Sequence, residues 1–409
     1  MNDRPQTLDS HGDYSAKSFA GALELFVIQP TSFCNINCDY CYLPDRAIRR
    51  LMSQTTLLRA FQRLFESSFV SRQFSVVWHA GEPLSVPLSF YEEALENITA
   101  LNTLRCEVQH NIQTNATLLN DKWCRFLAEK EFQVGISLDG PKFLHDLHRK
   151  RRSGKGTFED AMRGMSLLQD HEIKFRVICV VTQDSLDHAD EIFAFFENLG
   201  VTSLAFNIEE AEGANRFSSL SAASDGALRL FVNKLFTLWL RSRRRYPIRE
   251  FDGLLGAVGQ CSESSRLVSQ QADPFRIISV DVDGNFSTFS PELLAYKDFW
   301  FGNVITDVLD NCVGTERFRR VYDAILDGIE QCKATCDYFC LCGGGAPSNK
   351  FFERGTFACS ETRHCINTKK VFVDEIFDVL EVQFGLRSAR RANGAPADQR
   401  CHGGAGLRV

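Results

Sequence analysis

The sequence has no apolar run of membrane-spanning length, no signal peptide and no excess of positive charge. Its longest apolar runs have the length of a β-strand, whereas a membrane-spanning helix needs about 20 apolar residues. Residues 1–20 are polar and lack the apolar core of a secretory signal. The formal net charge of −6 gives no reason to expect nucleic acid as a partner. We therefore expect a cytoplasmic protein that binds neither membrane nor nucleic acid.

Cysteine, by contrast, is abundant. The 409 residues include 15 cysteines, in a chain that is 44% apolar and 24% charged, as is typical of a soluble globular protein. This length allows two or three domains. Because a cytoplasm keeps thiols reduced, clustered cysteines indicate a metal site rather than disulfides. Three of the cysteines lie within residues 34–41, and six lie within residues 332–365.

The first group contains Cys34, Cys38 and Cys41, which are separated by three and two residues. Thiolates at such close spacing can converge on one metal centre from a short loop. A four-iron cluster needs four ligands, and the next cysteine along the chain is the distant Cys106. Three ligands would leave one iron open, and an open metal position suggests chemistry rather than a structural role. The alternatives are a zinc site or three unrelated buried cysteines.

Strand-like and helix-like periodicities alternate about six times over residues 24–208. Such alternation predicts βα units and a parallel sheet, which right-handed crossovers can curl into an open barrel. The cysteine loop follows the first strand, at the edge where α/β barrels place active sites. We expect strands at 24–30, 73–78, 108–113, 133–138, 175–181 and 203–208, and helices at 55–69, 88–101, 121–130, 158–171 (capped by Thr157) and 185–199 (ended by Gly200).

Short polar motifs follow three of these strands. Gly81 and Glu82 belong to His79-Ala-Gly-Glu-Pro83, Gln113-Thr-Asn115 ends the next strand, and Ser137-Leu-Asp139 ends the one after it. A glycine lets backbone approach a ligand closely, and a carboxylate can bind an ammonium group. An ordinary turn or a helix cap would account for each motif taken alone.

The second half of the chain has a different organisation. A long helix is expected over 225–245, and the basic residues at its end, 241–245, would interact favourably with the helix dipole. A hairpin is expected around Asp283-Gly284. The cysteine-rich region then follows. We expect a flexible lead at 1–22, a barrel at 23–225, a helical linker at 226–272, a smaller cysteine-rich domain at 273–385 and a disordered tail at 386–409.

The segment Cys34-Asn-Ile-Asn-Cys38-Asp-Tyr-Cys41 matches the signature of the radical SAM superfamily. The resemblance implies a partial (β/α)6 barrel in which the three cysteines hold a [4Fe-4S] cluster. It also implies that S-adenosylmethionine (SAM) chelates the open iron. One electron, from a flavodoxin- or ferredoxin-like donor, then cleaves SAM to a 5′-deoxyadenosyl radical that abstracts a hydrogen atom.

The strand-end motifs extend this resemblance. His79-Ala-Gly-Glu-Pro83 is similar to the GGEP element of the family, with Ala80 in place of the first glycine, a change that matters little if the φ angle of Ala80 is negative. The resemblance implies that SAM is bound by Tyr40, Gly81, Glu82, Gln113, Asn115 and Ser137. Asp139 and Arg149 are candidate substrate-binding residues, and a surface ion pair is the alternative role of Arg149.

The C-terminal cysteines resemble the SPASM extension of radical SAM peptide maturases. Cys332-x3-Cys336-x5-Cys342 is followed at a distance by Cys365, while Phe289 and Ala346 stand where the full pattern has cysteines. The resemblance therefore implies one auxiliary [4Fe-4S] cluster, held by Cys332, Cys336, Cys342 and Cys365. Cys340 is a substitute ligand and Cys359 a less favoured one, and a four-cysteine zinc site is the alternative.

Three further segments resemble maturases of the GrrM/OscB type: Phe289–Leu294, Cys342–Lys350 and Glu361-Thr362. That resemblance implies abstraction of a Cβ hydrogen from a ribosomally made precursor peptide and attack on an aromatic ring, giving a three-residue cyclophane. Glu209, Glu210 and Glu292 are candidates for the base. The alternatives are thioether formation (the sactipeptide type), a sulfatase-maturase-like activity and a non-catalytic, metal-stabilised binding protein.

Overall fold

The computed structural model describes residues 14–221, 225–258 and 269–385. Its described part contains one curved sheet of nine strands in the order β6-β5-β4-β3-β2-β1-β7-β8-β9. The first six strands are β1 (Leu25–Ile28), β2 (Gln73–Trp78), β3 (Glu107–Thr114), β4 (Gln133–Ser137), β5 (Phe175–Val181) and β6 (Leu204–Ile208). The remaining three are β7 (Ile277–Val280), β8 (Asn285–Thr288) and β9 (Gly302–Asn303).

Strands β1 to β6 are all parallel, as the alternating pattern predicts. The predicted α/β class with an open parallel barrel and a C-terminal extension is thereby confirmed. Strand β7 of the extension pairs in parallel with β1, and β8 and β9 complete the sheet in antiparallel fashion. The predicted hairpin around Gly284 is therefore not a separate sheet but a continuation of the barrel.

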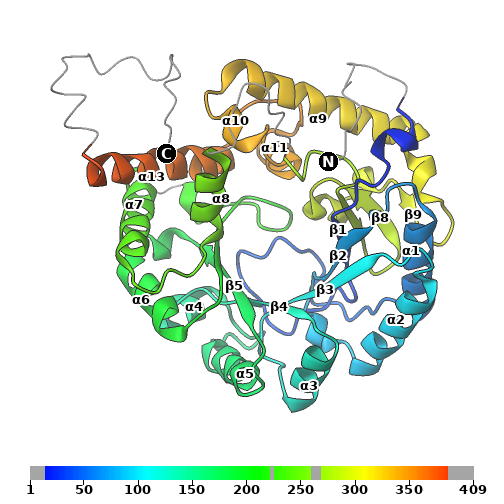
Figure 1. Ribbon diagram of the computed structural model, residues 1–409, viewed down its shortest axis with the longest axis horizontal. Helices are drawn as coiled ribbons and strands as arrows, with labels where there is room; N and C mark the ends of the chain where they lie inside the picture. Colours follow the sequence, from blue (N-terminus) through cyan, green and yellow to red (C-terminus); the bar gives the residue numbers. More distant parts are fainter. Residues whose placement is uncertain (1–13, 222–224, 259–268, 386–409) are drawn as a thin grey trace.

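Helices cover the outside of this sheet (Figure 1). The barrel helices are α1 (Gln54–Glu66), α2 (Leu88–Leu101), α3 (Asp121–Glu129), α4 (Lys142–His148), α5 (Phe158–Asp170) and α6 (Ala189–Leu199), followed by α7 (Asp225–Arg241) and α8 (Arg249–Val258). The extension adds α9 (Glu316–Thr335), α10 (Phe339–Cys342), α11 (Pro347–Arg354), α12 (Arg363–Cys365) and α13 (Val371–Gln383), the last of which packs on α7. None of the described helices has both the length and the apolar character needed to cross a membrane.

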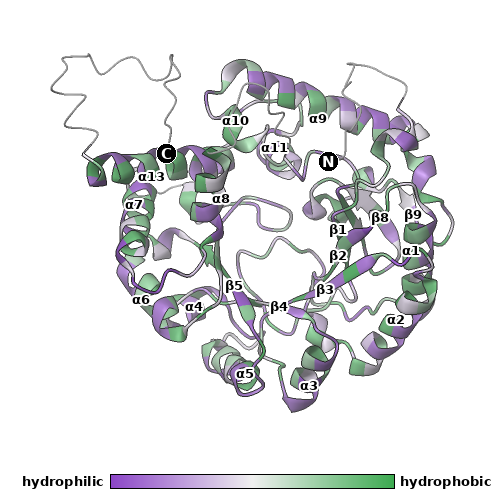
Figure 2. Ribbon diagram, viewed as in Figure 1, coloured by the Kyte–Doolittle hydropathy of each residue, from purple (hydrophilic) through white to green (hydrophobic). Residues whose placement is uncertain are grey.

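The helices of the barrel are held by their apolar faces, and Figure 2 shows hydrophobic and hydrophilic residues together on each. In α1, Phe61 and Leu64 are buried, and the ring of Phe61 lies 5.2 Å from that of Phe26 in β1, edge to face. Ser53 caps this helix by accepting a hydrogen bond from the backbone of Thr56. Gly200 ends α6 in the left-handed conformation, as predicted.

The N-terminal segment differs from expectation in part. Ala16–Phe19 form a 3-10 helix, and the side chain of Phe19 is buried against Phe275, with ring centroids 5.3 Å apart. Residues 14–22 therefore belong to the fold, because an aromatic side chain in the lead has a core to enter. The rest of the predicted lead and the predicted tail lie outside the described residues.

The structure also corrects the expected cap of one helix and the expected end of another. Thr157 occupies the N-cap position of α5 but makes no capping hydrogen bond. Its hydroxyl donates instead to the carbonyl oxygen of Arg149, and the carboxylate of Asp146 accepts from the backbone of Phe158. The long helix after the barrel ends at Arg241, short of the predicted 245, and α8 begins at 249 within the predicted linker.

Candidate active site

The cysteine loop leaves the carboxyl end of β1 and is held by two arginines. Arg46 donates to the carbonyl oxygens of Cys38 and Leu43 at 3.1 and 3.0 Å, and Arg152 donates to that of Cys34 at 2.9 Å. The loop carbonyls are thus fixed by guanidinium groups. Sequence reasoning missed both arginines, because Arg152 lies 118 positions from Cys34 and no local pattern connects them.

All three loop cysteines have free thiols. Burial raises the pKa of Cys34 and of Cys38 to about 12, so neither thiol ionises readily without a partner. Metal binding supplies that partner, because a metal-bound cysteine is a thiolate. Three free thiols on one braced loop at the mouth of the barrel fit an iron–sulfur cluster with an open position.

Glu82 lies beside this loop and is almost fully buried. Its carboxylate accepts hydrogen bonds from the Thr114 hydroxyl at 2.7 Å, from the Asn115 backbone at 2.9 Å and from the Leu84 backbone at 3.0 Å. Burial raises the pKa of Glu82, while these three donors act against that shift. The carboxylate is thus oriented from two neighbouring strand ends, as a group that must receive an ammonium requires.

Gly81 allows the two loops to approach each other. Its φ is +69°, and a Cβ atom there would lie 2.5 Å from the carbonyl oxygen of Thr31 and 2.7 Å from that of Phe33. Ala80 has a φ of +70°, so the condition under which alanine in place of glycine would matter little, a negative φ, is not met. The turn has two consecutive left-handed residues, and only the second of them is a glycine.

The polar residues at the next strand ends meet as the parallel sheet predicts. Gln113 donates to the hydroxyl of Ser137 at 2.9 Å. The side-chain amide of Asn115 donates to Asn35 at 2.9 Å and lies 3.8 Å from the sulfur of Cys34. The structure therefore gathers the predicted SAM contacts along one edge of the sheet. Their role toward SAM stays a prediction.

Asp139 and Arg149, the two candidate substrate-binding residues, form a buried ion pair with each other. Arg149 donates two hydrogen bonds to the Asp139 carboxylate at 2.8 and 3.0 Å, and the Tyr40 hydroxyl donates a third at 2.5 Å. Although burial by itself raises it, the neighbouring guanidinium holds the pKa of Asp139 below its usual value. Arg149 is therefore no surface residue, and the pair positions Tyr40 next to Cys41.

The C-terminal cysteines surround a cavity of about 560 Å³ between the barrel mouth and the extension. Four of them line it: Cys332, Cys336, Cys342 and Cys365. Cys332 lies in the last turn of α9 and Cys336 follows it, while Cys342 ends α10 and is followed by Gly343, Gly344 and Gly345, all with positive φ. Four free thiols around one space fit an auxiliary cluster. Their assignment as its ligands stays a prediction.

The two other cysteines of this region are placed differently. Cys359 is partly buried, and its sulfur lies 3.7 Å from the carbonyl oxygen of Thr356. Cys340 is disulfide-bonded, so its sulfur is not free to substitute for a ligand in this structure. The disulfide also departs from the expectation of uniformly reduced cysteines.

Three glutamates also line this cavity: Glu210 and Glu212, which follow β6 of the barrel, and Glu292, which follows β8 of the extension. We call them the carboxyl trio. Burial raises the pKa of Glu210 and of Glu292 to about 7, and burial together with Glu210 raises that of Glu212. Within the described chain, Glu212 Oε1 and Glu292 Oε2 are buried without a hydrogen-bond partner. No sequence motif singled out Glu212.

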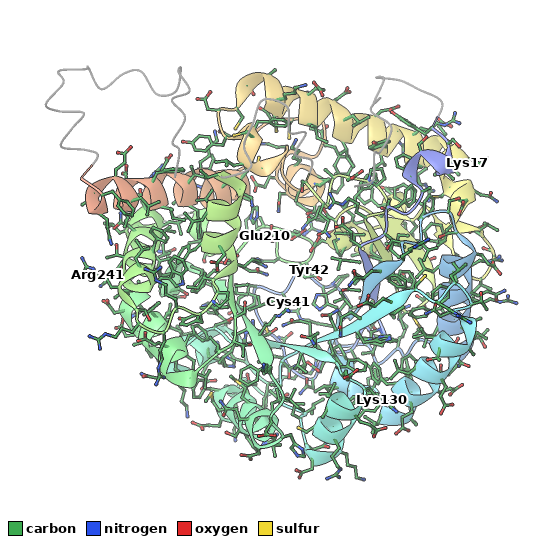
Figure 3. All side chains as sticks on the ribbon, in the orientation of Figure 1. Lys17, Cys41, Tyr42, Lys130, Glu210 and Arg241 are labelled. Carbon is green, nitrogen blue, oxygen red and sulfur yellow. The ribbon has the colours of Figure 1, made fainter. Side chains whose placement is uncertain are left out.

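Figure 3 shows Cys41, Tyr42 and Glu210 near one another toward the middle of the molecule. Glu292 also lines a neighbouring cavity of about 370 Å³ together with Tyr42 and His79, whose Oη and Nε2 atoms lie 3.3 Å apart. The trio therefore lies between the cysteine loop and the C-terminal cysteines. Glu209, by contrast, accepts hydrogen bonds from the backbone and hydroxyl of Ser219, so its carboxylate serves a local turn.

Comparison with known proteins is consistent with this geometry. The Radical SAM superfamily model matches residues 28–196. The uncharacterized protein sll1766 of Synechocystis sp. is 43% identical over 378 residues, which cover 90% of this chain and 94% of that protein. Residues 28–196 therefore form a radical SAM domain.

The relatives of this radical SAM protein include sulfatase-maturating enzymes. The serine-type anaerobic enzyme of Bacteroides thetaiotaomicron is 27% identical over 81% of this chain and 84% of its own length. The structure of anSMEcpe with bound AdoMet and Kp18Cys peptide has a TM-score of 0.74 and 25% identity, covering 88% of this chain and 99% of that one. The fold is also shared with the structure of Streptococcus suis SuiB bound to precursor peptide SuiA. That structure has a TM-score of 0.62 and 16% identity, and the match covers 85% of this chain and 77% of that one.

The predicted cofactors of this radical SAM protein are confirmed: they are SAM and [4Fe-4S] clusters, including an auxiliary one. The relative from Bacteroides thetaiotaomicron is a sulfatase-maturating enzyme, and the anSMEcpe structure has a peptide bound. The cyclophane subgroup finds no counterpart among the relatives described above and stays a prediction.

Proposed function

We propose that this radical SAM protein is a peptide maturase that removes a Cβ hydrogen from a residue of a ribosomally made precursor and joins that carbon to a nearby aromatic ring. The product would be a three-residue cyclophane. We place the reaction in the cytoplasm, with an external flavodoxin- or ferredoxin-like electron donor.

The observation that carries the proposal is the limited set of auxiliary ligands. Phe289, which stands where the SPASM pattern has a cysteine, is fully buried, with its ring 6.1 Å from that of Phe318. Ala346, at the other such position, lines the cavity without a thiol. The space beside them is bordered by the carboxyl trio. This arrangement favours one auxiliary cluster with proton acceptors next to it.

The chain's own residues divide the task. The SAM cluster would be held by Cys34, Cys38 and Cys41. The auxiliary cluster would be held by Cys332, Cys336, Cys342 and Cys365. SAM itself would be bound by Tyr40, Gly81, Glu82, Gln113, Asn115 and Ser137. When bound, the first cluster with SAM supplies the radical that removes the hydrogen atom, and the auxiliary cluster supplies an electron acceptor.

Closing the aromatic ring onto carbon leaves one proton to be removed from the ring. The carboxyl trio suits this step, because a base with a pKa near the working pH is both available and strong enough to act. Glu210 and Glu292 both have a pKa near 7 and line the cavity, whereas Glu209 is engaged with Ser219. We therefore assign the proton to the trio and not to Glu209.

The test is an anaerobic reaction of the reconstituted protein with reductant, SAM and the short peptide encoded beside its gene. We expect a loss of two hydrogens, with fragmentation suppressed across three residues that include an aromatic and no cysteine. A two-hydrogen loss that requires a cysteine would instead show thioether formation. If deoxyadenosine forms but the peptide is unchanged, the protein is a radical SAM enzyme and this peptide is not its substrate. If SAM is not cleaved at all, the result supports the alternative of a non-catalytic binding protein.

Sulfatase maturation is the second candidate, favoured by the relatives and by the fit to a peptide-bound maturase over 88% of this chain. The same reaction with serine- and cysteine-containing sulfatase peptides tests it. Modification of those peptides, with the neighbouring precursor unchanged, would replace the cyclophane proposal.

A further inference from the structure

Lys350 is a buried lysine beside the C-terminal cysteines. It lies in α11 with a relative exposure of 5%. Its ammonium nitrogen donates to the carbonyl oxygen of Gly328 at 2.8 Å and lies 3.3 Å from the sulfur of Cys332, which is equally buried. A Cβ atom on Gly328 would lie 2.9 Å from this nitrogen, so the glycine leaves the room that the ammonium group occupies.

Lys350 has few other neighbours that could stabilise its positive charge. Among the described residues, no carboxylate lies within ion-pair distance of its nitrogen. On one side it borders a recess lined by Ile329 and Phe357 that has no room for a water molecule. On the other side it lines the cavity that the four cysteines share. Its open side therefore faces the space in which the auxiliary cluster would lie.

A buried ammonium without a counter-charge is costly, and proteins pair such groups. The nearest group here that can become anionic is the Cys332 sulfur, which is a thiolate when it binds iron. Hydrogen bonds to the sulfurs and the net charge around a cluster are two of the factors that set its reduction potential. Reduction adds negative charge, which an adjacent cation stabilises.

We propose that Lys350 is the charge partner of the auxiliary cluster, donating a hydrogen bond to the Cys332 sulfur and raising the cluster's reduction potential. This inference rests on the proposed assignment of Cys332 as a ligand. Within the proposed reaction it makes the cluster a better acceptor for the one electron that leaves the crosslinked ring with its proton. Lys350 is then a positioning and tuning residue, not one that touches the peptide.

The experiment uses the full chain with Cys34, Cys38 and Cys41 changed to alanine, so that the auxiliary cluster alone gives the signal. Iron content and the midpoint potential, from redox titration followed by electron paramagnetic resonance, are measured for this parent, for Lys350→Met and for Lys350→Gln. Lys333→Met is the matched control, because Lys333 follows Cys332 directly but its side chain is 62% exposed.

We expect about four irons in the parent and a midpoint that is more negative in Lys350→Met. Lys350→Gln, which keeps an N–H donor without the charge, should fall between the two, and Lys333→Met should resemble the parent. A Lys350→Met protein with its iron retained and an unchanged midpoint overturns the inference while leaving the cluster assignment intact. A parent that binds no auxiliary iron overturns both.

A second measurement covers the case in which the variants lose their iron. The parent is grown with 15N-lysine, and pulsed electron paramagnetic resonance is recorded on the reduced cluster. A weak coupling to a lysine nitrogen, retained in Lys333→Met, is expected from a hydrogen bond to the Cys332 sulfur. A loaded parent without this coupling overturns the proposed contact.

Discussion

Ala80 and Gly81 are consecutive left-handed residues at the base of the cysteine loop. An L side chain in this conformation costs about 1–2 kcal/mol. Replacing Ala80 by Gly should therefore raise the free energy of unfolding by about 0.5–1 kcal/mol, the relief being partly offset by the added freedom of the unfolded chain. The thermal midpoint of the anaerobically loaded protein measures this change, and a lower midpoint would contradict it.

Gly81→Ala should have the opposite and larger effect. The new Cβ would press on two backbone oxygens of the cysteine loop, in addition to the left-handed strain, at a cost of about 3 kcal/mol or more. Gly21→Ala is the control, since Gly21 has a φ of +65° but nothing within 4 Å of the added Cβ. We expect Gly81→Ala to lower the thermal midpoint well beyond the control and to reduce iron loading. Equal midpoints for the two variants would argue against close packing of the turn on the loop.

The carboxyl trio predicts a pH dependence at the residue scale. Burial raises the pKa of Glu210 and Glu292 from about 4.5 to about 7, so the folded protein holds protons there that the unfolded chain releases. Their contribution to stability is therefore full below pH 4.5 and is lost as the pH rises through 7. A base must be ionised, so the rate of peptide modification should rise over the same upper range.

The measurement is the initial rate of modification from pH 5.5 to 8.5, with deoxyadenosine formation followed in parallel. Glu292→Gln should lower the rate and alter the inflection near pH 7, whereas Glu209→Gln should keep both. A rate that stays flat across neutral pH in the parent would remove the trio from the proton step.

At the scale of elements, the Asp139–Arg149 pair joins the end of β4 to the end of α4. Breaking a buried ion pair from one side leaves an unpaired charge and typically costs about 3–5 kcal/mol. We expect Arg149→Met to lose that much stability in thermal or denaturant unfolding. Lys142→Met, which removes an exposed pair with Glu159, should lose less than about 1 kcal/mol. A small loss in both variants would show that the buried pair is not a fixed part of the fold.

The segment from α9 to α10 contains three of the four cysteines that are predicted to bind the auxiliary cluster. The amount of iron bound per protein therefore tests whether these cysteines hold a cluster. The intact protein should bind about eight irons and Cys336→Ala about four, because each cluster holds four. Cys359→Ala should retain the full amount, since Cys359 lies outside the lining of the cavity. About twelve irons in the intact protein would show a second auxiliary cluster and would contradict the ligand assignment.

At the scale of the whole molecule, the sequence predicts those parts of the fold that depend on residues close together in the chain. Alternating periodicity placed β1 to β6, Gly200 ended α6, and the strand-end motifs met because parallel strands share an edge. The failures are contacts between distant segments. Arg152 reaching the carbonyl of Cys34, Glu212 joining Glu210 and Glu292, and Phe19 entering the core all depend on the folded path. The φ of Ala80 depends on the loop that its turn packs against.

The pairing of β7 with β1 has a consequence for how the protein can be divided. Leu25 to Ile28 form a complete register with Ile277 to Val280, so the first strand of the barrel is an interior strand only while the extension is present. A fragment ending before β7 would expose β1 as an unprotected edge, open to pairing with other chains. We therefore expect a chain that is cut before β7 to aggregate rather than to give a smaller working enzyme.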